Sequence, residues 1–73
     1  MKVIYDPETD SLYIEFRPLG AGEARCRDLS EDVTVDYGPD GKLAGIEVLD
    51  ASVLLGEELN RVVLEITPMM KTK

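Results

Sequence analysis

Carboxylates are the residues of this chain whose types and spacing could do chemistry, because its 73 residues include no histidine and a single cysteine. Glu15, Asp36 and Glu47 are expected on the outward faces of neighbouring strands. There they could form a carboxylate pair or a hard-cation site, in which one carboxyl raises the pKa of the other. The alternative is a solvated acidic face with Arg17 and Lys42 nearby, which is the usual state of charges on exposed strands. We therefore predict no catalytic or cofactor-binding residue and no cofactor, and keep these three carboxylates as metal candidates.

The stretch from Asp36 to Glu47, DYGPDGKLAGIE, resembles the calcium loop of an EF-hand, with Asp40 and Gly41 at matching positions. An EF-hand loop lies between two helices. Here the preceding residues, DVTVDY, are rich in β-branched side chains and predict a strand. Gly38 also stands where the third position should carry a carboxylate or amide. We interpret the stretch as the turn of a β-hairpin.

The lone thiol lies in EARCRDL, where Cys26 alternates with Arg25 and Arg27. Neighbouring cations lower the pKa of a thiol and can activate it, but alternation along a strand sends both guanidinium groups to the opposite face. The sequence thus predicts a buried, unreactive cysteine. One cysteine also excludes a disulfide within the chain, and without histidine it argues against the usual tetrahedral zinc site.

Short β-type segments must position these groups. KVIY, SLYIEFR and DVTVDY are rich in β-branched and aromatic residues, and apolar side chains alternate with polar ones in the last two. DPETD and GPDGK supply proline- and glycine-containing turns. The two strand–turn–strand units resemble each other at an offset of 32 residues, through duplication or convergence: Val3, Tyr5, Pro7, Ile14 and Glu15 recur as Val35, Tyr37, Pro39, Ile46 and Glu47.

The C-terminal third allows two interpretations. A short helix from about Ala51 to Leu59, capped by Asp50 or Ser52, followed by a last strand over Arg61–Thr67 is favoured, although helical spacing also continues through this segment. The predicted fold class is α+β. It is a single domain over residues 1–73 with a small antiparallel sheet of two β-hairpins plus a middle strand, one short C-terminal helix and a possible last strand within 51–67, and a tail at 68–73.

YDPETDSLYIEF near the start and VDYGPDGKLAGIEVLDAS further on resemble the YuzE-like family of uncharacterised short bacterial proteins. The resemblance covers about residues 1–55 and rests on Tyr5, Asp6, Pro7, Leu12, Tyr13, Ile14, Asp40, Gly41, Gly45, Ile46, Glu47, Leu49, Ala51 and Ser52. It implies a small α+β domain with no established activity and no catalytic residues to carry over. It also implies an antitoxin-like role as an alternative.

Charge and hydropathy restrict the partners. The net charge of −7, with bases mostly scattered, disfavours direct binding of nucleic acid and makes a basic protein the natural electrostatic partner. Without an apolar run of membrane-spanning length or a signal-peptide pattern, no membrane association is expected, and a cytoplasmic location is predicted.

Self-association is the leading functional prediction, because a chain this short forms a marginal core on its own. Tyr13 is expected on the solvent face, where either a second subunit or the C-terminal helix would cover it. The interface candidates are Tyr13, Leu59, Val62 and Ile66. We expect a non-enzymatic interaction module, most simply a homodimer; the alternatives are an acidic antitoxin-like regulator of a basic protein and a carboxylate-based metal site or enzyme.

Overall fold

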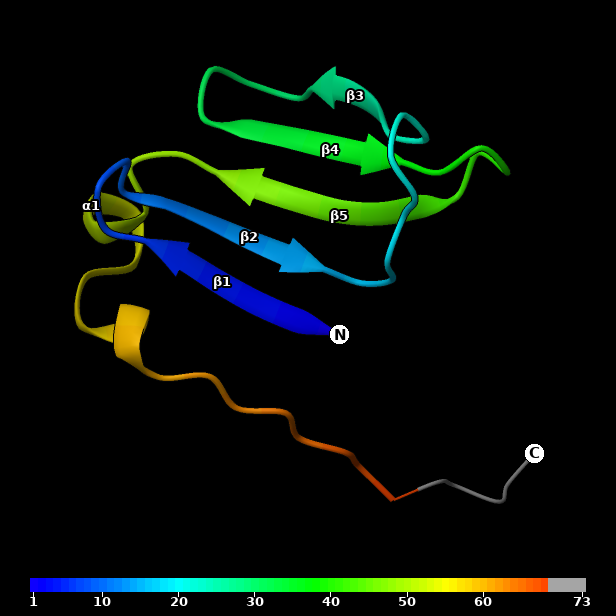
Figure 1. Ribbon diagram of the computed structural model, residues 1–73. Coiled ribbons are helices and arrows are strands. Elements are labelled where there is room, and N and C mark those ends of the chain that lie inside the picture. Colours follow the sequence, from blue (N-terminus) through cyan, green and yellow to red (C-terminus); the bar gives the residue numbers. More distant parts are fainter. Residues whose placement is uncertain (69–73) are drawn as a thin grey trace.

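The computed structural model describes residues 1–68, which form one five-stranded antiparallel sheet followed by a short helical segment (Figure 1). Its elements are β1 (Lys2–Asp6), β2 (Ser11–Glu15), β3 (Arg25–Asp28), β4 (Val33–Tyr37), β5 (Leu43–Val48), α1 (Ala51–Leu55) and the 3₁₀ helix η1 (Gly56–Asn60). The strand order across the sheet is β1-β2-β5-β4-β3. The α+β class and the two hairpins are confirmed, and the strand that is central in sequence, β3, lies at an edge of the sheet.

The two hairpins occupy equivalent places about the middle of the sheet. Val3 lies opposite Ile14 in the first hairpin, and Val35 lies opposite Ile46 in the second. β2 and β5 are neighbours, and there Ile14 lies opposite Ile46. The repeat of 32 residues therefore corresponds to an approximate two-fold relation about the seam between β2 and β5.

The connection from β4 to β5 is a turn with strands on both sides, as the sequence predicts. The amide of Gly38 donates to the carbonyl of Lys42 at 2.9 Å, and Gly41 has a φ of +80°, which glycine adopts without steric cost. Because β4 and β5 pair directly across this turn, the EF-hand interpretation is excluded.

Asp10, at the end of the turn between β1 and β2, holds the start of α1. Its carboxylate accepts hydrogen bonds from the amide of Ser52 at 3.0 Å, from the Ser52 hydroxyl at 2.7 Å and from the Tyr5 hydroxyl at 2.7 Å. Asp50 occupies the N-cap position of α1, as one of the two predicted alternatives has it, but its side chain makes no capping bond, and Ser52 lies within the helix and donates to Asp10. These donors lower the pKa of the Asp10 carboxyl, the Tyr5 hydroxyl having the largest effect.

The helix is shorter than predicted, and the last strand does not form. Gly56, with a φ of +58°, ends α1 at Leu55, and a 3₁₀ turn replaces the predicted α-helix as far as Leu59. Residues 61–68 then run in an extended path that is neither strand nor helix, so the strand predicted over Arg61–Thr67 is wrong for the single chain. Residues 69–73 of the predicted tail lie outside the described part.

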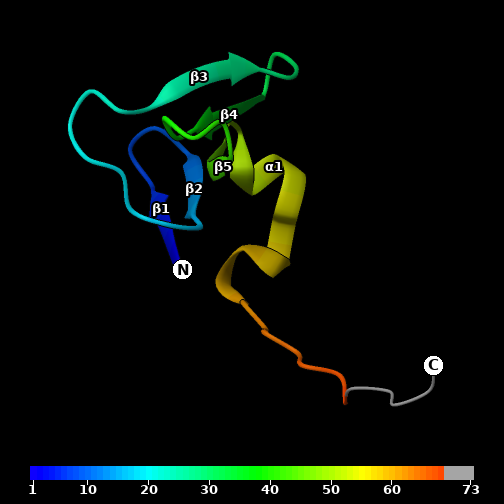
Figure 2. The same cartoon turned by 90° about the vertical axis from the view of Figure 1, so that its right-hand side faces the viewer.

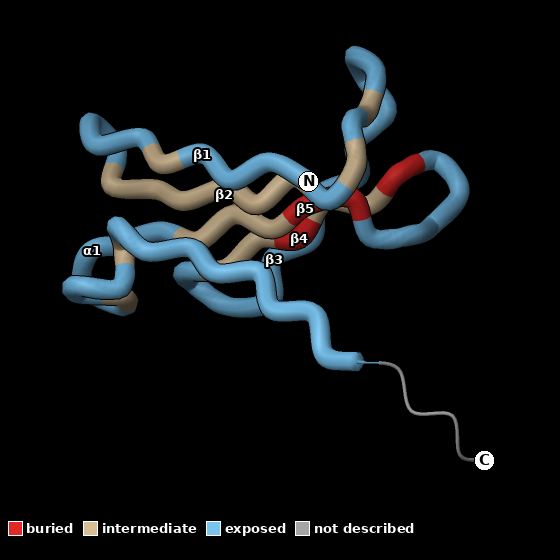
Figure 3. Tube along the Cα trace, turned by 90° about the horizontal axis from the view of Figure 1, so that it is seen from below, coloured by how far each residue is buried: buried red, intermediate tan, exposed pale blue. Residues whose placement is uncertain are grey.

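The core of this sheet is small. Among residues 1–68, the buried apolar side chains are those of Val35, Ala44 and Ala51, and most residues from Ser52 onwards are exposed (Figure 3). The chain exposes 6021 Å², whereas a compact folded monomer of this mass exposes roughly 4,500 Å². Many large apolar side chains of residues 1–68 are exposed, among them Val53, Leu54 and the run from Val62 to Leu64.

Candidate functional site

The sheet has two faces of different chemistry, because residues opposite each other on antiparallel strands share a face. One, which we call the polar face, carries Lys2, Ile4, Asp6, Ser11, Tyr13, Glu15, Cys26, Asp28, Thr34, Asp36, Gly45 and Glu47. The other, the apolar face, carries Val3, Tyr5, Leu12, Ile14, Arg27, Val33, Val35, Ile46 and Val48. Each face is a separate candidate surface.

At the centre of the polar face the side chain of Tyr13 lies across β5. Its hydroxyl donates to the carboxylate of Asp36 at 2.9 Å, and it passes directly over Gly45, which lacks a side chain. Partial burial and the bond to Asp36 together raise the pKa of the Tyr13 hydroxyl to about 12. The side chain is thus held by its own sheet.

Tyr13 lies on the face where the sequence predicts it, but the C-terminal helix does not cover it. The grooves beside α1 and η1 are lined by Val3, Leu12 and Ile14 on one side and by Val33 on the other, all from the apolar face. Figure 2 shows α1 standing on that one side of the sheet. The expectation that the helix covers Tyr13 is therefore wrong.

The three metal candidates share the polar face but do not converge. Glu15 and Asp36 lie on either side of Gly45, and Glu47 lies in the row of Tyr13 and Thr34. The carboxylate of Asp36 already accepts the Tyr13 hydroxyl. Within residues 1–68, no group of three or more acidic, cysteine or histidine side chains could hold a metal ion. The three carboxylates are half-buried and lie apart from one another on this face.

Cys26 is not on a core face, so the prediction of a buried thiol is wrong. It is exposed, and it lies opposite Asp36 on the polar face. Arg27 instead lies opposite Val35 on the apolar face. The carboxylate of Asp36, with smaller effects from partial burial and Asp28, raises the pKa of the thiol. The thiol is therefore less ionised than a free cysteine, and the activated-thiolate alternative is also unsupported.

The apolar face is only partly covered by the helical segment. A groove of about 280 Å³ lies between the apolar face and the segment formed by η1 and the residues that follow it. The lining of this groove includes Val3, Ile14, Leu59 and Val62. A second groove of about 270 Å³ lies on the other side of α1, where Val33, Leu49, Val53 and Leu54 contribute apolar surface. The helix thus stands between two open grooves.

The predicted interface candidates lie in different surroundings. Leu59 is half-buried and lines the first groove, whereas Val62 and Ile66 are 71% and 82% exposed in the extended segment. Tyr13 is half-buried on the opposite face. Sequence reasoning did not single out Asp10 or Val53, and it named Gly45 only as part of the family resemblance, because their structural roles depend on contacts between segments far apart in the chain.

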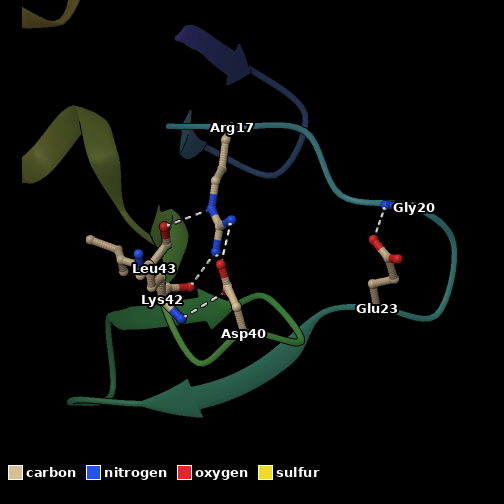
Figure 4. Close-up of polar contacts among 6 residues, drawn as sticks. All are labelled: Arg17, Gly20, Glu23, Asp40, Lys42 and Leu43. Carbon is tan, nitrogen blue, oxygen red and sulfur yellow. Dashed lines mark hydrogen bonds and ion pairs between the residues drawn. The ribbon is translucent and has the colours of Figure 1, made fainter.

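An ion pair closes the end of the sheet opposite α1. The guanidinium of Arg17 donates two hydrogen bonds to Asp40, at 2.6 and 3.0 Å, and also donates to the carbonyls of Lys42 and Leu43 (Figure 4). It thereby ties the segment after β2 to the turn between β4 and β5. The Arg17 guanidinium, helped by the amide of Lys42, lowers the pKa of the Asp40 carboxyl from 3.8 to about 2.

This ion pair predicts a loss of stability in acid. Because the folded-state pKa of Asp40 lies below its ordinary value, its contribution is fully present above about pH 4 and is lost as the pH falls through about 2. We expect the Asp40→Asn variant to lose less stability than the wild type between pH 4 and pH 2. Urea unfolding at a series of pH values measures this, and parallel curves for the two proteins would contradict it.

Comparisons with known proteins place the chain in a family. A family model described as a protein of unknown function (DUF2283) matches residues 2–52, so the chain belongs to this family. No curated protein and no solved structure matches the chain. The match supports the expectation of a family without an established activity. Over the described residues, no helix has the length and apolar character needed to cross a membrane.

Proposed function

We propose that this member of the DUF2283 family is a non-enzymatic interaction module that associates with a second copy of itself. The observation that carries the proposal is the apolar face, which its own helical segment leaves partly open. The YuzE-like resemblance of about residues 1–55 agrees with a small module without catalytic residues.

The exposed area is larger than that of a compact monomer. The chain exposes about 1,500 Å² more than a compact monomer of its mass. A stable interface buries about 800 Å² on each partner. Part of the excess belongs to the extended segment, and part lies around the grooves beside α1, where Val53 and Leu54 are 82% and 67% exposed. Association would cover this surface.

The apolar side chains also supply the driving force. Full burial of a valine or leucine contributes about 1.5–3 kcal/mol. In a symmetric dimer each contact occurs twice, because the same patch is used on both subunits. A charge placed in this patch should therefore weaken the dimer strongly without disturbing the monomer.

Val53→Glu tests the proposal. We expect native mass spectrometry and light scattering to show a dimer for the untagged wild type, and a dissociation constant raised at least tenfold for Val53→Glu. Leu29→Glu is the matched control, since Leu29, like Val53, is an exposed aliphatic side chain, at 61%, but lines neither groove. A wild type that stays monomeric at all concentrations, or equal losses in both variants, would overturn the proposal.

The polar face favours a second candidate, the binding of a basic protein. Glu15, Asp28, Asp36 and Glu47 share this face with a single base, Lys2. Such a complex should weaken with salt, because charge complementarity governs it. A defined basic partner whose affinity falls on Glu15→Gln and Glu47→Gln, and is unchanged by Val53→Glu, would support it; insensitivity to salt would count against it.

A further inference from the structure

β1 has an open outer edge at a place where the other half of the sheet has a strand. The approximate two-fold relation exchanges β1 with β4, and β4 carries β3 on its outer side. Within residues 1–68 no strand pairs with the equivalent side of β1. An unpaired edge leaves a row of backbone donors and acceptors available for another strand.

The segment after η1 has the features of a strand without a partner. Its backbone is extended at Arg61, with φ −134° and ψ 113°. Val62, Val63 and Leu64 are 71%, 62% and 74% exposed, although such side chains favour strands in a sheet. Its first residues, Arg61 to Val63, line the groove that Val3 of β1 also lines, and Figure 2 shows the segment leaving on the side of α1 and running away from the sheet as it continues.

One antiparallel register matches this segment to β1 at all five positions. It sets Arg61 opposite Asp6 and Glu65 opposite Lys2, two pairs of opposite charge, on the polar face. The same register sets three apolar or aromatic pairs opposite each other: Val62 with Tyr5, Val63 with Ile4 and Leu64 with Val3.

Neighbouring registers lose this match. A shift of two residues in one direction places Arg61 opposite Ile4, and a shift in the other direction places Glu65 there. Opposite charges and apolar pairs directly across a ladder stabilise it, whereas a charge opposite an apolar residue contributes nothing comparable. Lys2 can take part in such a pair, since its side chain is 68% exposed and its ammonium group lies 3.9 Å from the carboxylate of Glu15, a long ion pair.

We propose that residues 61–65 of one copy pair in this register with β1 of a second copy, and that the exchange is reciprocal. The inference rests on the proposed self-association and adds to the contact around Val53 a second contact, at the outer edge of β1. A second copy is the favoured partner because the segment leaves η1 on the apolar side of its own sheet, across a groove from Val3, and not along the open edge of its own β1. Each sheet then has six strands, and the edge of β1 is covered as β3 covers β4.

Paired cysteines test both the register and the partner. Two double variants, Ile4→Cys/Val63→Cys and Val3→Cys/Leu64→Cys, are made with Cys26→Ser. Consecutive antiparallel pairs alternate between hydrogen-bonded and closer non-hydrogen-bonded positions, so one of the two is suited to a disulfide. We expect that variant to form a covalent dimer on oxidation, read from non-reducing gels and intact mass. Ile4→Cys/Leu64→Cys, which breaks the register, is the control and should react far less.

The outcomes separate this inference from the proposed function. A disulfide closed within one chain shows that the segment pairs with its own β1 and overturns the exchange. No disulfide in either variant, with a wild type that is still a dimer, overturns the exchange and leaves the self-association standing. A monomeric wild type overturns both.

A charge reversal checks the register without cysteines. We expect Glu65→Lys to raise the dissociation constant roughly fivefold by setting two lysines opposite each other, and Lys2→Glu in the same chain to restore it. If Lys2→Glu brings no recovery, the register is wrong.

Discussion

Replacing Gly45 with alanine is expected to lower the free energy of unfolding by about 1–3 kcal/mol, the usual cost of overpacking. A Cβ at this position would overlap the Tyr13 hydroxyl and ring, and it would lie 3.0 Å from the carbonyl oxygen of Ile14. Tyr13 must then leave Asp36. Because burial and that hydrogen bond raise the pKa of Tyr13 to about 12, its ionisation should move towards the ordinary value near 10.

Urea unfolding and ultraviolet titration of the tyrosines measure the two effects of Gly45→Ala. Gly20→Ala is the matched control, since an added Cβ there meets only the flexible side chain of Glu23, and it should change stability by less than about 0.5 kcal/mol. Tyr13→Ser should relieve much of the cost in the double variant. A Gly45→Ala protein with unchanged stability and titration would show that Tyr13 does not lie over β5.

The second large effect is expected at Asp10. Asp10→Gly removes the acceptor of three hydrogen bonds, from Tyr5 and twice from Ser52. Because Asp10 has a φ of +53°, glycine takes its place without backbone strain, and the change isolates the side chain. We expect the melting temperature to fall by roughly 5–10 °C, and the Ser52 amide to lose protection from hydrogen exchange.

Asp50→Gly is a closely matched control. Asp50 has the same φ of 53°, is also acidic, and makes no side-chain capping bond to α1. Asp50→Gly should leave the melting temperature nearly unchanged. Asp10→Asn keeps an acceptor oxygen, so its melting temperature should lie between those of Asp10→Gly and Asp50→Gly. Equal effects of Asp10→Gly and Asp50→Gly would mean that the carboxylate of Asp10 does not anchor the helix.

The sequence was sufficient for the parts of the fold that local pattern controls. Alternation around Leu12 and Ile14 predicts which face of β2 is apolar, and Pro7 and Gly41 predict turns where turns occur. The offset of 32 residues predicts that Val3 and Val35 hold equivalent positions, and they do. These features depend on neighbours in the chain, so composition and period are enough to find them.

Cys26 shows where local pattern fails. Alternation in β3 separates the cysteine from the arginines correctly, but it does not say which set faces the core. The turn after β3 decides this, because the amide of Leu29 bonds the carbonyl of Val33 and fixes Arg27 opposite Val35. Because β3 is an edge strand, little side-chain burial favours the opposite orientation, with Cys26 towards the core. The prediction of a strand at Arg61–Thr67 fails for a different reason, since a strand forms only beside a partner strand.

The two-fold relation of the hairpins bears on the order in which the chain folds. Each hairpin closes over a tight turn, so its ends meet at small entropic cost and within microseconds. The seam between them pairs Ile14 with Ile46, 32 positions apart. We expect the halves to form early and their docking along β2 and β5 to limit the rate. Substitutions at the seam should then slow refolding, while those at the outer edges should mainly speed unfolding.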